Sequence, residues 1–262
     1  MIDIPKALEE RYGKRHLSYS SLKVALTDMA KFDQYMKGEL KFTSDALDFG
    51  TLYDMLLFDR DKAMDTYHII SHERVLDRLS DKAKSAKRPQ MTSEYKAVVA
   101  AMNTEAIEGN KIICSPEHWK QANDMIDRLH TCGLYERTLA NGRYQVEFND
   151  VIGGVEVKGF LDCLRDGFII DSKSTKDIEK FRYSVRDFSY DIQAYIYTKV
   201  FGISRFYWLA QEKSYPYLPA LIECSEETLF TGGMKFDEAV RRIARFLKDG
   251  GDPMTDFLEF KV

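Results

Sequence analysis

Four charged side chains in the middle of the chain have residue types and an order suited to metal-assisted hydrolysis of a phosphodiester. They are Glu147, Asp162, Asp171 and Lys173, in the order E…D…DxK. A phosphodiester is an anion that water attacks poorly. A Mg²⁺ ion held by two or three carboxylates screens that charge and lowers the pKa of bound water. A lysine beside the metal orients the water or stabilises the developing charge. The DxK triplet alone is a weak signal, because Asp-Ser-Lys is common in surface loops.

Three predicted β-strands position these side chains. Residues 143–148, 155–162 and 168–174 are short runs with alternating or continuous apolar positions, separated by Asn, Asp and Gly turn residues. Successive side chains of a strand point to opposite faces, so Asp171 and Lys173 point the same way. The strands therefore strengthen the DxK signal.

The rest of the chain predicts helices around this hairpin pair. Helical spacing of apolar residues and capping residues predict helices at 17–38, 44–58, from 92 onward, 117–131, 187–200 and 225–248. Residues 111–114 are predicted to be extended. Two further strands are expected at 205–212 and 217–224, the latter at a sheet edge because Pro219 interrupts it.

The predicted fold class is α/β (α+β), with a central mixed sheet of about five strands flanked by helices and an N-terminal helical layer. We expect a single domain over residues 1–262, mainly helical in 1–135 and with the strand-containing core in 136–262. No repeat, low-complexity tract or Gly/Ser-rich linker suggests a further division.

The composition is that of a soluble globular protein: 262 residues, 44% hydrophobic and 31% charged. The four cysteines form no CxxC pair and are expected to be reduced thiols, and the N-terminus has no apolar signal sequence, so we expect a cytoplasmic protein without a membrane span. The net charge of −4 gives no overall signature of nucleic-acid binding. A local basic cluster remains, which is either a solvated loop or a phosphate-contacting patch: Lys82, Lys84, Lys87 and Arg88.

Several motifs together resemble one nuclease family. The run GFLD…IIDSKST at 159–175 is followed by Gln193…Tyr197, a Q-x-x-x-Y element on the next helix. These motifs are similar to the PD-(D/E)XK nuclease superfamily, in its RecB-type exonuclease branch. The segments LSYSSLK, SDALDFGTLYDMLLFD, RPQMTSEYK and QEKSYPY further resemble the C-terminal nuclease domain of phage and prophage RecE (exonuclease VIII). The resemblance covers about residues 17–248 and implies a restriction-endonuclease-like core.

The resemblance implies a role for each matching position. Asp162 and Asp171 would bind the metal, with the carbonyl of Ser172 as a further ligand, and Lys173 would be the catalytic lysine. Glu147 matches the upstream acidic position of the family, or is a solvent-facing strand residue. Three further residues match positions on the helix after the DxK strand that support the site or contact DNA, although Tyr190 is equally compatible with a core role: Gln193, Tyr197 and Tyr190.

One position departs from the family pattern. Family members carry a histidine four residues after the glycine of a GT-x-x-H motif, whereas here Gly50-Thr51-Leu52-Tyr53 is followed by Asp54. An aspartate is a hard oxygen ligand that suits Mg²⁺. Asp54 is therefore expected either to be a metal ligand that alters metal affinity or to be a solvated flank residue of its helix.

The function implied by the resemblance is a Mg²⁺- or Mn²⁺-dependent exodeoxyribonuclease acting on linear double-stranded DNA, 5′→3′, in phage or prophage recombination. The family further implies a homo-oligomer and a single-strand annealing protein as partner. The alternatives are a catalytically weakened nuclease-like protein that binds DNA ends, and a structural or regulatory phage protein that reuses the fold.

Overall fold

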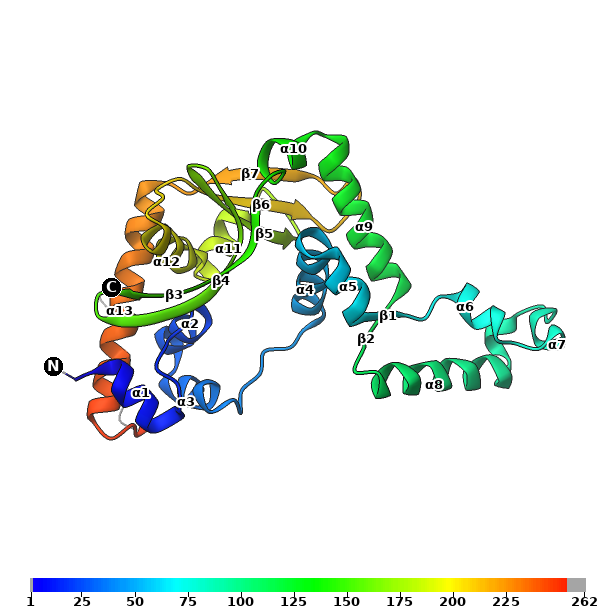
Figure 1. The fold of residues 1–262 in the computed structure, drawn as a ribbon, viewed down its shortest axis with the longest axis horizontal. Coiled ribbons are helices and arrows are strands. Elements are labelled where there is room, and N and C mark those ends of the chain that lie inside the picture. Colours follow the sequence, from blue (N-terminus) through cyan, green and yellow to red (C-terminus); the bar gives the residue numbers. More distant parts are fainter. Residues whose placement is uncertain (1, 254–262) are drawn as a thin grey trace. The chain divides into compact units, whose positions relative to one another are not determined.

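The computed structural model describes residues 2–253, which form two compact units. Unit 1 consists of Met1–Thr43 and Leu134–Val262, and unit 2 is the inserted stretch Ser44–Gly133. Figure 1 shows the elements of each unit. The positions of the units relative to one another are not determined, so the prediction of a single domain stays a prediction.

Unit 1 is organised around a five-stranded mixed sheet in the order β3-β4-β5-β6-β7. All neighbouring pairs are antiparallel except β5 and β6, which are parallel. This confirms the predicted sheet and places the Pro219 strand at its edge. The strands are β3 (Arg143–Ile152), β4 (Val155–Arg165), β5 (Phe168–Thr175), β6 (Phe206–Glu212) and β7 (Pro219–Glu223).

Helices enclose the apolar side of the sheet. Three of them, α2, α12 and α13, lie side by side and contribute buried residues to one core with the strands (Figure 1). α13 approaches α12 closely because Gly232 has no side chain: a Cβ there would lie 2.1 Å from the carbonyl oxygen of Asp191. The helices of unit 1 are α1 (Ile4–Tyr12), α2 (Tyr19–Thr27), α3 (Met29–Lys37), α10 (Leu134–Thr138), α11 (Phe181–Asp187), α12 (Tyr190–Phe201) and α13 (Glu226–Lys248).

One predicted helix is split in the structure, and another begins three residues later than predicted. The helix expected at 17–38 is split at Asp28, whose carboxylate accepts the N–H groups of Ala30 at 2.8 Å and Lys31 at 3.1 Å and so caps α3. The helix expected from Asp187 begins instead at Tyr190. Ser189 adopts a left-handed backbone conformation (φ 56°), which separates α11 from α12. Both differences arise at single residues between helices, which the periodicity of apolar positions does not reveal.

Unit 2 is mainly helical. Helix α4 packs against α9, and both predicted helices are confirmed. The expected extended piece at 111–114 is β2, which pairs in parallel with β1, a strand that was not predicted. The elements are α4 (Asp45–Phe58), α5 (Arg60–Thr66), β1 (Tyr67–Ile69), α6 (His72–Asp77), α7 (Asp81–Lys84), the 3₁₀ helix η1 (Pro89–Met91), α8 (Ser93–Glu108), β2 (Ile112–Cys114) and α9 (Pro116–Thr131). Within residues 2–253 no helix is both long and apolar enough to cross a membrane.

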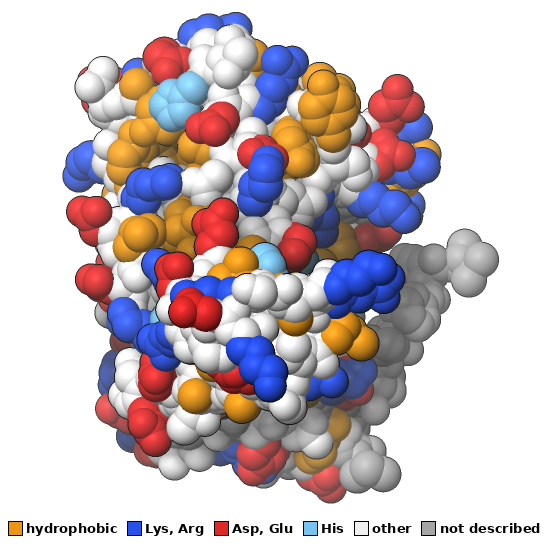
Figure 2. All heavy atoms as spheres, turned by 90° about the vertical axis from the view of Figure 1, so that its right-hand side faces the viewer, with side chains coloured by type: hydrophobic (Ala, Val, Ile, Leu, Met, Phe, Trp, Pro, Cys, Tyr) orange, Lys and Arg blue, Asp and Glu red, His pale blue; other side chains and the backbone are white. Residues whose placement is uncertain are grey.

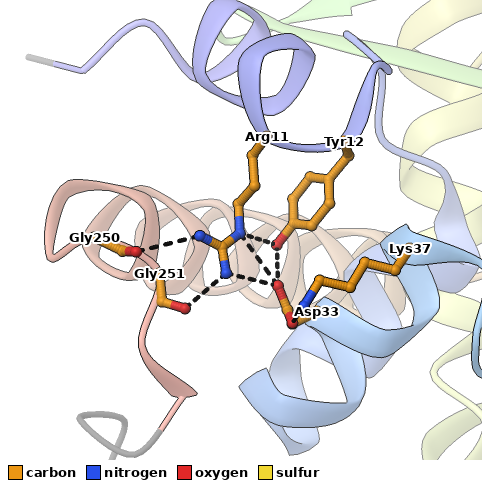
Figure 3. Close-up of polar contacts among 6 residues, drawn as sticks. All are labelled: Arg11, Tyr12, Asp33, Lys37, Gly250 and Gly251. Carbon is orange, nitrogen blue, oxygen red and sulfur yellow. Dashed lines mark hydrogen bonds and ion pairs between the residues drawn. The ribbon is translucent and has the colours of Figure 1, made fainter.

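A polar network ties the two ends of unit 1 together (Figure 3). The Asp33 carboxylate accepts hydrogen bonds from Arg11 Nη2 at 2.9 Å and from Tyr12 Oη at 2.8 Å, and it forms an ion pair with Lys37. The same guanidinium donates to the carbonyl oxygen of Gly251 at 2.8 Å. Burial alone would raise the pKa of Asp33, but hydrogen bonds from Lys37, Tyr12 and Arg11 outweigh it and hold that pKa below its usual value.

We expect Asp33→Asn to lower the free energy of unfolding by about 2 kcal/mol at neutral pH, because the neutral amide loses the negative charge and keeps only one of the two acceptor oxygens. The folded-state pKa of Asp33 is depressed, so its contribution is complete above the ordinary aspartate pKa of about 4 and is lost as the pH falls through the folded-state value. Urea unfolding at pH 7 and pH 3 would measure this. The gap between wild type and variant should shrink at pH 3; a gap independent of pH would contradict the assignment.

Candidate functional site

The predicted site lies at a fork in the sheet. β4 pairs with β5 only from Arg165↔Phe168 to Cys163↔Ile170, and the two strands separate at the next position, where Asp162 would face Asp171. Beyond the fork, the free edge of β4 is taken by Leu17, which donates its N–H to Glu156 O and accepts from Lys158 N, both at 2.9 Å. The N-terminal segment thus holds the strands apart and leads directly into α2.

Asp162 bridges the fork with its side chain. Its Oδ2 accepts the backbone N–H of Ser172 at 2.9 Å, replacing the ladder bond that β4 no longer provides. Its Oδ1 lies 3.5 Å from Nε2 of Gln145, the residue directly opposite it on β3. Gln145 has a positive φ of 48°, and the β3–β4 ladder has no pair at this position. A strained non-glycine residue next to a charged cluster is typical of functional sites.

Asp171 and Lys173 form a buried ion pair on β5. The Asp171 carboxylate is fully buried, the Lys173 side chain is 17% exposed, and Lys173 Nζ also donates to the carbonyl oxygen of Ser172 at 3.1 Å. Burial alone would lower the pKa of Lys173, but the carboxylates of Asp171 and Asp162 outweigh it and raise that pKa above its usual value. Lys173 therefore carries its positive charge at neutral pH. Burial raises the pKa of Asp171 to about 7, with Lys173 opposing the shift.

These groups suit a divalent cation. Among residues 2–253, Asp171 Oδ1 is buried and has no hydrogen-bond partner, so one carboxylate oxygen is available. No three Asp, Glu, His or Cys side chains of those residues come together as a metal site. Two carboxylates, from Asp162 and Asp171, are however enough for Mg²⁺, which keeps several waters and binds substrate phosphates. The carbonyl of Ser172, with two lone pairs, can contribute as well.

Helix α12 supports the site from below. Tyr197 Oη donates to the carbonyl oxygen of Phe160 at 2.6 Å and accepts from Gln193 Nε2 at 3.0 Å, which fixes β4 two residues before Asp162. Tyr197 is 5% exposed, and its ring packs edge-on against Phe148. This geometry gives Gln193 and Tyr197 a supporting place; contact of Tyr197 with DNA stays a prediction.

Tyr190 lies directly beside the lysine. Lys173 Nζ is 5.0 Å from the centroid of the Tyr190 ring, which stacks on the buried ring of Phe181. A cation over an aromatic face is attracted by the ring quadrupole. Tyr190 therefore has both a core contact and a place beside the charged cluster.

Glu147 lies outside this cluster. Its side chain is 55% exposed and forms an ion pair with Lys158 at 2.8 Å, and its partner across the ladder is Phe160. The β3 residue beside Asp162 is Gln145, which the sequence reasoning missed because a glutamine matches no acidic motif. A catalytic role for Glu147 stays a prediction.

The remaining predicted residues belong to unit 2. Asp54 is half-buried on α4, and its role as a metal ligand stays a prediction because the units are not placed relative to one another. The basic cluster lies on and after α7, with all four side chains exposed: Lys82, Lys84, Lys87 and Arg88. Figure 2 shows a face on which basic side chains alternate with acidic ones and form no continuous patch. Phosphate binding by the cluster stays a prediction.

Two residues of the LSYSSLK segment also lie near Lys173. Tyr19 Oη donates to the carbonyl oxygen of Phe188, and burial raises the pKa of Tyr19. Lys23 Nζ is 5.5 Å from the Tyr19 ring, and burial, together with the charge of Lys173, lowers the pKa of Lys23. Only the fold brings these two residues of α2 near Lys173, so sequence spacing could not reveal them.

The family model of a PDDEXK-like domain of unknown function (DUF3799) matches residues 18–256. The chain belongs to this family. The match covers all of unit 2 and most of both segments of unit 1, and it confirms the PD-(D/E)XK resemblance.

One solved structure supports the fold. The chain resembles a provisionally assigned exonuclease from Eubacterium rectale with a TM-score of 0.61 and 16% identity, covering 94% of this chain and 90% of that one. This likeness confirms the restriction-endonuclease-like architecture. An alkaline exonuclease from Laribacter hongkongensis has a TM-score of 0.34 and 12% identity, over 69% of this chain and 90% of that one. This weak likeness adds no support for the fold. No curated protein matches the chain.

We expect Tyr197→Phe to lower the free energy of unfolding by about 1–3 kcal/mol, because the Phe160 carbonyl and the Gln193 amide lose their buried partner. Denaturant unfolding checks this. Tyr183→Phe is the matched control: its hydroxyl is bonded to Arg182 in an exposed position, so the change should stay within about 0.5 kcal/mol. Equal effects of the two substitutions would refute the supporting role of Tyr197.

Proposed function

We propose that the protein is a Mg²⁺-dependent exodeoxyribonuclease that hydrolyses phosphodiester bonds of linear double-stranded DNA. The observation that carries the proposal is the buried cluster of Asp162, Asp171 and Lys173 at the sheet fork. A buried ion pair adds little to stability once its desolvation is counted. The buried Asp171 Oδ1 has no hydrogen-bond partner among residues 2–253, and a bound ligand explains this oxygen better than a contribution to folding stability does.

Asp162 and Asp171 would hold the metal in this proposal, with the Ser172 carbonyl as a further ligand. When bound, Mg²⁺ supplies charge screening and an activated water. The Ser172 N–H fixes the rotamer of Asp162 through a 2.9 Å hydrogen bond, so that the carboxylate is already oriented before substrate arrives.

Lys173 would act on the phosphate as a cation. Its raised pKa makes it unsuitable as a general base at neutral pH, so its role is to donate a hydrogen bond to a phosphate oxygen as negative charge accumulates there. Its contacts with Asp171, with the Ser172 carbonyl and with the Tyr190 ring restrict where the ammonium group can lie. Gln193 and Tyr197 keep β4 in place beneath it.

The finer features of the proposed activity come from the RecE resemblance. They are 5′→3′ digestion, a homo-oligomeric state, a single-strand annealing partner, and a role in phage or prophage recombination inside the cytoplasm. A second candidate, a DNA-end-binding protein with weakened catalysis, is favoured by one observation, the aspartate at position 54 where the family carries histidine.

Linear duplex DNA should be degraded in the presence of Mg²⁺ or Mn²⁺, whereas closed circular DNA should persist. We expect Lys173→Ala and Asp162→Ala each to reduce the rate at least about 100-fold, since each removes a group that stabilises the transition state. Lys199→Ala, an exposed lysine on α12, is the matched control. Full activity in either site variant would refute the catalytic assignment, and an inert wild type with both metals would favour the end-binding alternative. Labels at the 5′ or 3′ terminus would give the polarity.

Asp54→Asn should raise the Mg²⁺ concentration for half-maximal activity by about tenfold or more if Asp54 is a ligand. Asp48→Asn on the same helix, where the carboxylate is exposed, should leave that concentration unchanged. A metal-soaked crystal would give an independent reading, with the Asp54 carboxylate roughly 2.0–2.5 Å from the ion. Identical metal titrations of the two variants would show that Asp54 is a solvated flank residue of its helix and not a ligand.

A further inference from the structure

We propose that Phe188 and Lys23 form a subsite for one unpaired nucleotide of the DNA strand, adjacent to the phosphate at Lys173. Phe188 would stack on the base, and Lys23 would bind the neighbouring phosphate. The inference rests on the proposed function, because it assumes that DNA is the substrate.

A continuous series of contacts connects the two residues to the catalytic cluster. The ring centroid of Phe188 lies 5.6 Å from that of Tyr190, and the Tyr190 ring lies 5.0 Å from Lys173 Nζ. On the other side, the Phe188 carbonyl accepts the Tyr19 hydroxyl, and the Tyr19 ring lies 5.5 Å from Lys23 Nζ. Through Tyr190 and Tyr19, Phe188 and Lys23 both lie in the neighbourhood of Lys173, whose charge also acts on Lys23.

Phe188 has the exposure of a binding residue. Its side chain is 49% exposed at the sharp bend formed by Ser189, although the protein has a large core available for aromatic rings. Its carbonyl oxygen accepts the Tyr19 hydroxyl, and its ring lies against that of Tyr190 with 34° between the ring planes. A fixed aromatic face open to solvent can stack on a base, but only on one that has left the duplex, because paired bases already stack on their neighbours.

Lys23 supplies the complementary charge. Within residues 2–253 no carboxylate forms an ion pair with Lys23, which is half-buried on α2. The carboxylates nearest to Lys173, those of Asp171 and Asp162, are already engaged with Lys173 and Ser172. Two half-buried or buried lysines facing one region repel each other, and a bound phosphate would relieve this repulsion.

A second exposed apolar site provides a control that distinguishes stacking at Phe188 from nonspecific hydrophobic binding. A hollow of about 590 Å³ lies between α12 and α13, with Phe230 (69% exposed) and Met234 (58% exposed) at its edge. Neither Asp162, Asp171 nor Lys173 lines it. Phe230 is therefore a matched exposed phenylalanine without a link to the charged cluster.

The test measures binding without divalent metal, so that no cleavage is needed. The probe is a single-stranded oligonucleotide carrying 2-aminopurine, whose fluorescence falls when the base stacks on an aromatic ring. We expect Phe188→Ala to weaken binding about 5- to 150-fold and to abolish the quenching, and Phe188→Tyr to restore both. Phe230→Ala and Tyr183→Ala should bind as wild type does. Phe188→Leu keeps the apolar volume without the aromatic face, which covers the case in which the alanine variant does not fold.

Lys23→Ala should weaken binding and reduce the slope of log K against log salt by about 0.7, the value for one phosphate contact on a single strand. Lys31→Ala, an exposed lysine on α3, should leave the slope unchanged.

Wild type that does not bind single-stranded DNA, or equal binding by the Phe188 and Phe230 variants, would overturn the subsite even if wild type degrades DNA. The expected binding pattern in a protein that degrades no DNA would instead uphold the subsite and reject the nuclease proposal.

Discussion

The sheet of unit 1 depends on one hydrogen bond in which a side chain replaces a neighbouring strand. At the position where β4 and β5 separate, the N–H of Ser172 is satisfied by the carboxylate of Asp162 rather than by a neighbouring strand. A buried backbone N–H without a partner costs about 1–3 kcal/mol, so this carboxylate is what permits the sheet to open there. Leu17 occupies the freed edge of β4. The opening brings two carboxylates, a lysine and the start of α2 into one small volume.

The charged side chains at the fork cost folding free energy, whereas a hydrolytic site requires them. Three charged side chains lie at the fork, and both Asp162 and Asp171 have pKa values raised by burial. Gln145 adds a strained backbone conformation directly opposite Asp162. Such costs are usually retained where pre-organised charge is needed. The apolar core beneath, with α12 and α13 packed through Gly232, supplies the rigidity that keeps these groups in position.

The sequence predicted much of this arrangement because strands and amphipathic helices leave a local pattern. The alternation along β3 to β5 predicted which residues share a face with Asp171, and Pro219 predicted an edge strand. Three features left no such pattern. The left-handed Ser189 delays the start of α12 to Tyr190, within the stretch predicted as helix. Gln145 lies opposite Asp162, where an acidic residue was expected on this strand, and the neighbourhood of Lys23 depends on contacts between segments some 150 residues apart. Periodicity describes neighbours along the chain, whereas the site is made by neighbours in space.

The insertion of unit 2 has a consequence for how the chain folds during synthesis. Unit 2 is continuous in sequence, so it can fold as soon as its last helix has left the ribosome. Helices α1 to α3 precede unit 2 in the chain, yet they pack against α13 and the Arg11 side chain bonds to Gly251, both of which follow unit 2. Helices α1 to α3 therefore reach these native contacts only after unit 2 and α13 have been made, and until then their apolar faces are open to chaperones or to other chains.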